Sequence, residues 1–214
     1  MLHWHISRLL LARVSMNYPH DTIGEVVSST ISACIAHCWN WKVVAPYGSL
    51  VYVDYQGYRL FGIVYQAQAG VDQDNHRAYA HGLELHQLEK EQPQIFHFLQ
   101  TKLSILMVGY EYNSVVYYCN CPFPAPVHGF ITLADPEVLH KFTAHPDYLH
   151  LLLCAPAYIA QPDELILALV RYQKEQQVLT DEKLVELTRH VWRLFAGDYN
   201  RLSVLTQRLE QFIM

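Results

Sequence analysis

Residues 49–65 read SLVYVDYQGYRLFGIVY, and this stretch decides the fold class. It contains two runs of β-branched and aromatic residues, 49–55 and 58–65, on either side of the pair Gln56-Gly57. Side chains alternate in character along the first run, which is typical of a strand with one buried face. A two-residue connection that contains glycine is typical of a tight hairpin. The stretch therefore predicts two antiparallel strands joined by a turn.

Further short runs of the same kind lie before and after this hairpin. Residues 23–27 and 31–39 precede it, and residues 102–112 and 128–132 follow it, with Tyr117-Tyr118-Cys119 as another strand or an extension. Short strands joined by glycine-bearing turns predict a small antiparallel barrel, because closure removes exposed strand edges. We expect residues 128–132 to be the last strand and to close the barrel.

A polar insertion interrupts the strands. Residues 70–83 resemble a loop, and residues 85–99 predict a short helix that breaks or restarts near Pro93. Further along, Pro122, Pro124 and Pro126 predict an extended connection, because proline lacks the backbone donor that a helix needs.

After residue 134 the pattern becomes helical. We expect four helices, which begin after Asp135-Pro136, at Pro162, after Thr180 and after Gly197-Asp198, where capping residues or proline suit a first turn. Apolar residues recur at the helical period in the last three: Leu165, Leu169 and Tyr172; Leu184, Leu187, Val191 and Leu194; Leu202, Leu205, Leu209 and Phe212. These stripes predict a packed helical bundle, with docking of a stripe on a partner as the alternative.

The composition excludes several classes of protein. Of 214 residues, 51% are hydrophobic and only 16% are charged, which excludes a disordered chain. No apolar run approaches the ~20 residues that span a bilayer, so we expect a soluble protein whose apolar surface a partner covers; peripheral membrane contact stays open. The net charge of −5 argues against a general nucleic-acid binder. Five cysteines without a regular spacing indicate reduced thiols in the cytoplasm.

Together these patterns predict an α+β chain in three parts. Residues 1–21 form an N-terminal extension, 22–133 a closed antiparallel β-barrel with an inserted helix, and 134–214 an all-helical C-terminal region. Met16 offers a second start codon, so the first fifteen residues are a start-site artefact, a small helix, or a targeting or membrane-touching segment.

The β segment resembles the HAS-barrel family, the N-terminal barrel of HerA-type ATPases and of ATP-synthase catalytic subunits. That family opens its first strand with I-G-x-V, enters the next with G-x-x-V and carries G-x-V in a later one. The matching positions here are Ile23, Gly24, Val26, Gly48, Val51, Gly62 and Val64. The chain resembles a freestanding, cyanobacterial-type HAS-barrel protein, because it has no G-x-x-x-x-G-K-[ST] motif and hence no phosphate cradle.

The resemblance implies an assembly role, because these barrels lie in rings and contact neighbouring subunits. We therefore expect a non-enzymatic adaptor, assembly factor or regulator without a cofactor. Its partner would be a ring ATPase, another protein or a second copy. The alternative is an accessory nucleic-acid-processing module that works with a HerA-type motor.

Candidate chemical sites are weaker. Cys119, Cys121 and His128 offer three ligands for zinc or iron, but C-x-C is a poor zinc spacing, and strand-borne thiols are the preferred interpretation. The five-residue intervals of His76, His81 and His86 favour a solvated loop. Cys38 and His37 are neighbours that would face opposite sides of a strand. We expect no catalytic residues and no bound metal.

Aromatic residues also gather in two places. One is Trp39-Asn40-Trp41, and the other contains Tyr110, Tyr112, Tyr117 and Tyr118. Such clusters can stack nucleic-acid bases, but without basic neighbours they favour a core or a protein interface.

Overall fold

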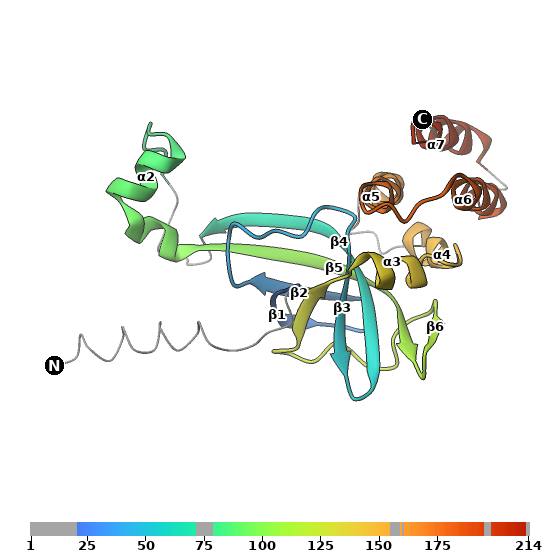
Figure 1. Ribbon diagram of the computed structural model, residues 1–214, viewed down its shortest axis with the longest axis horizontal. Coiled ribbons are helices and arrows are strands. Elements are labelled where there is room, and N and C mark those ends of the chain that lie inside the picture. The colour runs from blue at the N-terminus through green and yellow to red at the C-terminus, as the bar shows by residue number, and fades with distance from the viewer. Residues whose placement is uncertain (1–20, 72–78, 155–158, 160, 195–197, 213–214) are drawn as a thin grey trace.

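The chain folds as a β-barrel with its C-terminal helices packed at one end, and the insertion that carries a short helix and a 3-10 helix lies at the opposite end (Figure 1). The structure, a computed structural model, describes residues 21–71, 79–154, 159, 161–194 and 198–212. Its strands are β1 (Thr22–Ser29), β2 (Ala33–Cys38), β3 (Leu50–Tyr55), β4 (Tyr58–Val71), β5 (Leu99–Tyr112), β6 (Val115–Tyr117) and β7 (Phe130–Leu133). Its helices are α2 (Leu85–Glu91), the 3-10 helix η2 (Pro93–Phe98), α3 (Pro136–Phe142), α4 (Tyr148–Leu153), α5 (Pro162–Glu175), α6 (Asp181–Leu194) and α7 (Tyr199–Glu210). The predicted extension 1–21 lies almost entirely outside the described residues.

Six of the strands close into a barrel. The sheet order is β2-β1-β7-β3-β4-β5-β6, every pairing is antiparallel, and a further pairing between β2 and β5 closes the circle. β6 stays outside the circle and pairs with β5 alone. The predicted fold class, a closed antiparallel barrel followed by helices, is confirmed. The insertion between β4 and β5 carries α2 and η2, which meet at the predicted break near Pro93.

The hairpin that predicted the fold has the expected tight turn. Tyr55 pairs with Tyr58, and the two residues between them, Gln56 and Gly57, have φ angles of 49° and 81°. Positive φ at both central positions is the geometry of a type I′ turn, whose twist matches that of the strands it joins.

The barrel has apolar residues on both sides of its wall. Alternate residues of β3, β4 and β5 point inward, where they form the barrel core: Val51, Val53, Leu60, Val64, Leu103, Ile105 and Met107. Their neighbours point outward into a second core shared with the helices: Leu50, Phe61, Ile63, Leu106 and Val108. The helices therefore cover the outer face of β3, β4 and β5, which joins barrel and helices in one folding unit.

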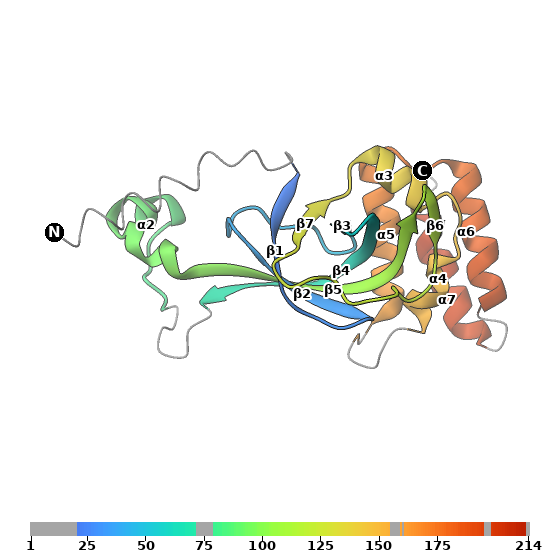
Figure 2. The ribbon, with the colours of Figure 1, turned by 90° about the horizontal axis from the view of Figure 1, so that it is seen from below.

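Helix α5 is the centre of the helical region. Its buried residues lie around most of its circumference and not on the single stripe that the sequence predicted: Leu165, Ile166, Leu167, Ala168, Leu169, Val170, Tyr172 and Gln173. The reason is the position of α5, which lies between the barrel and the outer helices α6 and α7 (Figure 2). Residues on its opposite sides therefore face different neighbours.

Paired charges fix α7 on α5. Arg201 donates two hydrogen bonds to Asp163, at 2.8 and 2.6 Å, and Arg208 makes a similar two-point contact with Glu164. The bonds from Arg208 lower the pKa of the Glu164 carboxyl. Such half-exposed pairs contribute little stability, but their geometry sets the orientation of the two helices.

One helix and two strand boundaries differ from the prediction. Helix α4 was not predicted, because six residues are too few to show a helical period. β4 extends to Val71 and not only to Tyr65, since its last residues are small or polar and lack the β-branched character that marked the rest. The strand predicted at Tyr117-Tyr118-Cys119 is β6, which ends at Tyr117. None of the helices in the described part of the chain has both the length and the hydropathy of a membrane-spanning segment.

Candidate docking surface on the barrel

The glycine and valine positions of the predicted barrel motif lie in the wall of the barrel. Ile23, Val26, Val51 and Val64 are buried in the barrel core. At Gly24 and Gly62 a Cβ atom would overlap the carbonyl oxygen of His37 or the side chain of Ile105. These residues therefore shape and close the barrel and offer no surface to a partner.

Gly48 has a different position, at the junction of the barrel with the helices. Its φ is +84°, and a Cβ atom there would lie 2.6 Å from the Cβ of Ala168 in α5. The absence of a side chain lets the turn before β3 press against the backbone of α5. The side chain of Arg171 also reaches the Tyr47 carbonyl, at 3.4 Å.

The structure does not bring the candidate metal ligands together. Cys121 is buried in the barrel core and donates to the Gly109 carbonyl at 3.3 Å, whereas the Cys119 side chain is exposed. His128 lies beside Glu25. Within the described ranges, no three His, Cys, Asp or Glu side chains form a group suited to a metal ion. His76, with the neighbouring Asp72 and Asp74, lies outside the described residues.

The cysteines differ sharply in their environments. Burial raises the pKa of the Cys34 and Cys121 thiols to about 12 and that of Cys38 to about 11. Cys38 and its neighbour His37 face opposite sides of β2, as expected, with the thiol directed into the barrel core.

We therefore expect a thiol-reactive dye at neutral pH to label Cys119 and Cys154 rapidly, and Cys34, Cys38 and Cys121 only after unfolding. The raised pKa values keep the buried thiols protonated, and only the thiolate reacts. Counting dye equivalents with and without denaturant tests this. Rapid labelling of Cys34 or Cys121 in the folded protein would contradict the barrel interior described here.

Polar and aromatic side chains gather on the outer face of β2, β1 and β7, away from the helices. Glu25 stands between His37 on β2 and Phe130 on β7 in the strand register. Its carboxylate accepts a hydrogen bond from Trp39 Nε1 at 3.0 Å and lies 3.2 Å from His128 Nδ1. We call Glu25, Trp39, His128 and Phe130 the barrel-face cluster.

The aromatic members of this cluster are exposed but held in place. Trp39 and Phe130 are 38% and 44% exposed, and their rings meet edge to face with centroids 5.5 Å apart. Val27, on β1 like Glu25, and Val127, shortly before β7, are also exposed. An aromatic pair fixed by a neighbouring carboxylate loses little conformational freedom on binding, which suits it to a protein interface.

Only part of this cluster could be predicted from the sequence. Trp39 belongs to the predicted aromatic group Trp39-Asn40-Trp41, but the two tryptophan rings diverge, since Trp41 stacks on Phe96 of η2 at 5.4 Å. His128 was expected beside the cysteines. Glu25 and Phe130 were missed, although strand alternation along 22–29 does place Glu25 on the opposite side from the buried Val26.

The predicted tyrosine cluster lies on and around β4, β5 and β6. Tyr58 stacks on Tyr112 at 4.3 Å, and Tyr110 stacks on Tyr117 at 5.0 Å. Tyr118 belongs elsewhere, because its hydroxyl donates to the Phe142 carbonyl at 2.7 Å and its ring packs among the helices. These rings mainly support strand pairing between β4, β5 and β6.

The closed barrel, with Trp39 and Phe130 partly exposed on one outer face, has the form of a small β-barrel module. Comparison with known families agrees with this class: residues 23–113 match the family model of the HAS barrel domain. The match covers β1 to β5, and the barrel is completed by β7, which lies beyond it. No curated protein matches the chain. The HAS barrel domain suggests a protein-interaction or docking module.

Proposed function

We propose that this protein is a non-enzymatic adaptor or assembly protein that docks through its HAS barrel on the barrel of a ring ATPase. The barrel-face cluster carries this proposal. Helices cover the outer face of β3, β4 and β5, whereas the face of β2, β1 and β7 presents exposed aromatic and aliphatic side chains to solvent. An apolar surface bounded by polar groups is typical of an interaction site.

The shape of the cluster supports a protein partner. Tryptophan is enriched among the residues that dominate binding energies, and Trp39 lies between Glu25 and Phe130, which restrict its rotation. Glu25 and His128 supply polar atoms at the rim, where hydrogen bonds set the orientation of a partner. A barrel of the same family is the proposed partner, because the resemblance to HAS-type barrels implies contact between neighbouring barrels in a ring.

ATP hydrolysis would then belong to the partner. The sequence has no G-x-x-x-x-G-K-[ST] motif with which to bind the phosphates of a nucleotide. The chain would add a docking surface on one side and its own helical region on the other, as an adaptor or regulator does.

Binding between the purified protein and a purified ring ATPase of its host, HerA-type or ATP-synthase-type, tests the proposal. We expect Trp39→Ala to weaken the affinity by about thirtyfold or more, since such residues contribute about 2 kcal/mol or more. Trp192→Ala on α6, which removes a tryptophan that is 50% exposed from the helical region, serves as the matched control and is expected to bind normally.

Equal affinity of wild type and Trp39→Ala would contradict the assigned surface. Absence of binding to either ATPase would overturn the proposed partner. Tight, salt-sensitive binding to DNA without an ATPase would instead favour a nucleic-acid module, because phosphate contacts release counterions.

A further inference from the structure

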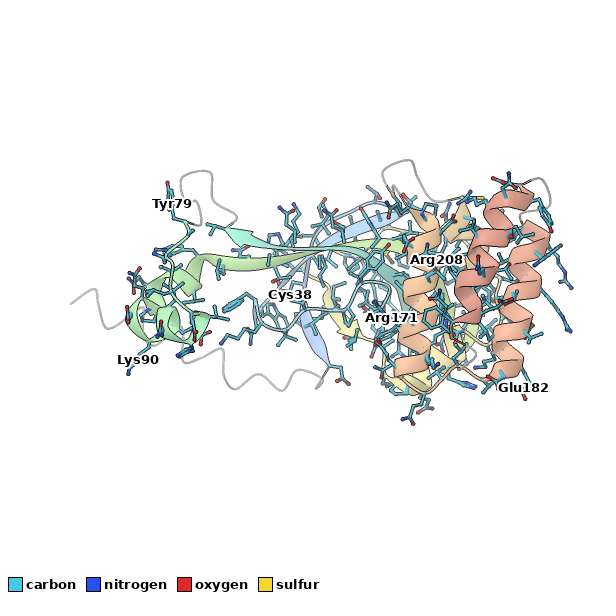
Figure 3. The ribbon with its side chains drawn as sticks, turned by 90° about the horizontal axis from the view of Figure 1, so that it is seen from above. Cys38, Tyr79, Lys90, Arg171, Glu182 and Arg208 are labelled. Carbon is cyan, nitrogen blue, oxygen red and sulfur yellow. The ribbon has the colours of Figure 1, made fainter. Side chains whose placement is uncertain are left out.

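Among the strands that the structure describes, none pairs with the outer side of the end of β4. β3 pairs with β4 only from Tyr58 to Ile63, whereas β5 continues beside β4 to its last residue, Val71. We call residues 66–71 the β4 edge. Among the described residues, no backbone or side-chain group hydrogen-bonds to its outer side. In Figures 2 and 3, β4 forms the outer side of the β4–β5 pair where the two strands run toward α2.

The strand register shows which backbone groups face outward. The Met107 amide donates to Ser32 on the β2 side, and β5 pairs with β2 without a register shift from Leu106 to Thr101. N–H and C=O groups alternate in direction along an antiparallel strand, so the even-numbered residues of β5 face β4. Their partners on the β4 edge are Gln66, Gln68 and Gly70. The residues that direct their backbone groups outward are therefore Ala67, Ala69 and Val71.

The β4 edge lacks the features that protect exposed strand edges. It contains no charged residue and no proline. The β-bulge of β4 lies before it, between Val64 and Gln66, and the register from Gln66 to Val71 is regular. Natural proteins protect such edges with lysine, proline or a bulge, and an edge without them is a template for another strand.

The β4 edge is also complementary to itself. In an antiparallel pair centred on Ala69, that residue lies opposite its own copy, Ala67 opposite Val71, and Gln68 opposite Gly70. Every outward N–H and C=O group of the three outward residues then has a partner. Side chains also match by face, because Ala67, Ala69 and Val71 share one face of the sheet and the two glutamines share the other.

We propose that the β4 edge pairs with the β4 edge of a second copy, which gives a two-fold dimer with one sheet running through both barrels. A second copy is favoured over other strands because no charge opposes close approach at the two-fold axis. The side chains at its centre are alanines, which allow the two strands to meet without a clash. The dimer does not use the barrel-face cluster, so it stands independently of the proposed function.

Sedimentation velocity over a concentration series tests the dimer. We expect the wild-type protein to shift from the 24.8 kDa mass of the chain toward twice that mass as concentration rises. Ala69→Pro should remain at the mass of the chain, because it removes an outward N–H that the monomer does not use. Its thermal unfolding should stay close to that of wild type. Gln56→Ala in the β3–β4 turn, outside the β4 edge, serves as the control and should dimerise like the wild type.

A charge exchange identifies the second copy as the occupant. Ala69→Lys and Ala69→Glu should each be monomeric, since like charges would meet at the two-fold axis. A mixture of the two should dimerise again. Ser203→Lys on the exposed side of α7 adds the same charge elsewhere and should leave the wild-type dimer intact.

Three results would overturn the proposal. One is a wild-type protein that stays monomeric across the series, and another is a dimer that Ala69→Pro and Ala69→Lys leave unchanged. The third is an Ala69→Lys and Ala69→Glu mixture that remains monomeric. Should Ala69→Pro fail to fold, the charge exchange still decides the outcome. A dimer lost through Trp39→Ala but not through Ala69→Lys would place the contact on the barrel-face cluster instead.

Discussion

Replacing Phe142 by alanine is expected to lower the free energy of unfolding by about 3–5 kcal/mol, the usual cost of deleting a buried phenylalanine side chain. Phe142 is fully buried at the end of α3, between the barrel and the helices. Its ring lies 4.9 Å from Phe61 on β4 and 5.4 Å from Tyr148 on α4. The cavity would therefore open in the core that the two parts of the chain share.

Phe130→Ala provides the matched control, because the Phe130 side chain is 44% exposed and its loss should cost less than about 1.5 kcal/mol. Denaturant unfolding followed by tryptophan fluorescence and by circular dichroism measures both changes. The shared core also predicts coincident transitions with the two probes. Equal losses for the two variants, or separate transitions for barrel and helices, would contradict the packing described here.

Gly24→Ala is expected to destabilise the barrel by about 3 kcal/mol or more, since an added methyl group must displace backbone. A Cβ atom at residue 24 would overlap the carbonyl oxygen of His37 and lie 2.9 Å from the Cα of Cys38. Both atoms belong to β2, which pairs with β1 at this point. The strands would have to separate where the barrel closes.

Gly70→Ala separates this effect from a general cost of replacing glycine in a strand. A Cβ atom at residue 70 meets nothing within 4 Å, so the change should be neutral or slightly stabilising. Thermal unfolding midpoints of the two variants give the comparison. A Gly24→Ala protein as stable as Gly70→Ala would show that β1 and β2 are not held as closely as their register implies.

Much of the fold could be predicted because the decisive signals are local. Gln56-Gly57 between two alternating runs specifies a hairpin, and Asp135 caps α3 by accepting a hydrogen bond from the Val138 amide at 2.8 Å. Such signals depend on residues within a few positions of one another. The closure of the barrel followed from the number of short strands, although the pairing of β2 with β5 is a long-range contact that no short motif specifies.

The candidate site was predicted less well because it depends on neighbours from distant strands. Glu25, Trp39 and His128 meet only after β1, β2 and β7 are paired, and each residue taken alone has an ordinary sequence context. The β4 edge was missed for a related reason. Residues 66–71 are small or polar, so their strand character comes from pairing with β5 and not from their own preference.

Recovery of the tagged protein from its native host, followed by mass spectrometry, tests the central claim most directly. If the barrel docks on a ring ATPase, a HerA-type motor or ATP-synthase subunits will be recovered in constant proportion, and Trp39→Ala will lose them while Trp192→Ala retains them. Recovery of the protein without any ring ATPase, or of the same ATPase by wild type and Trp39→Ala alike, would contradict the claim that this face is the docking surface.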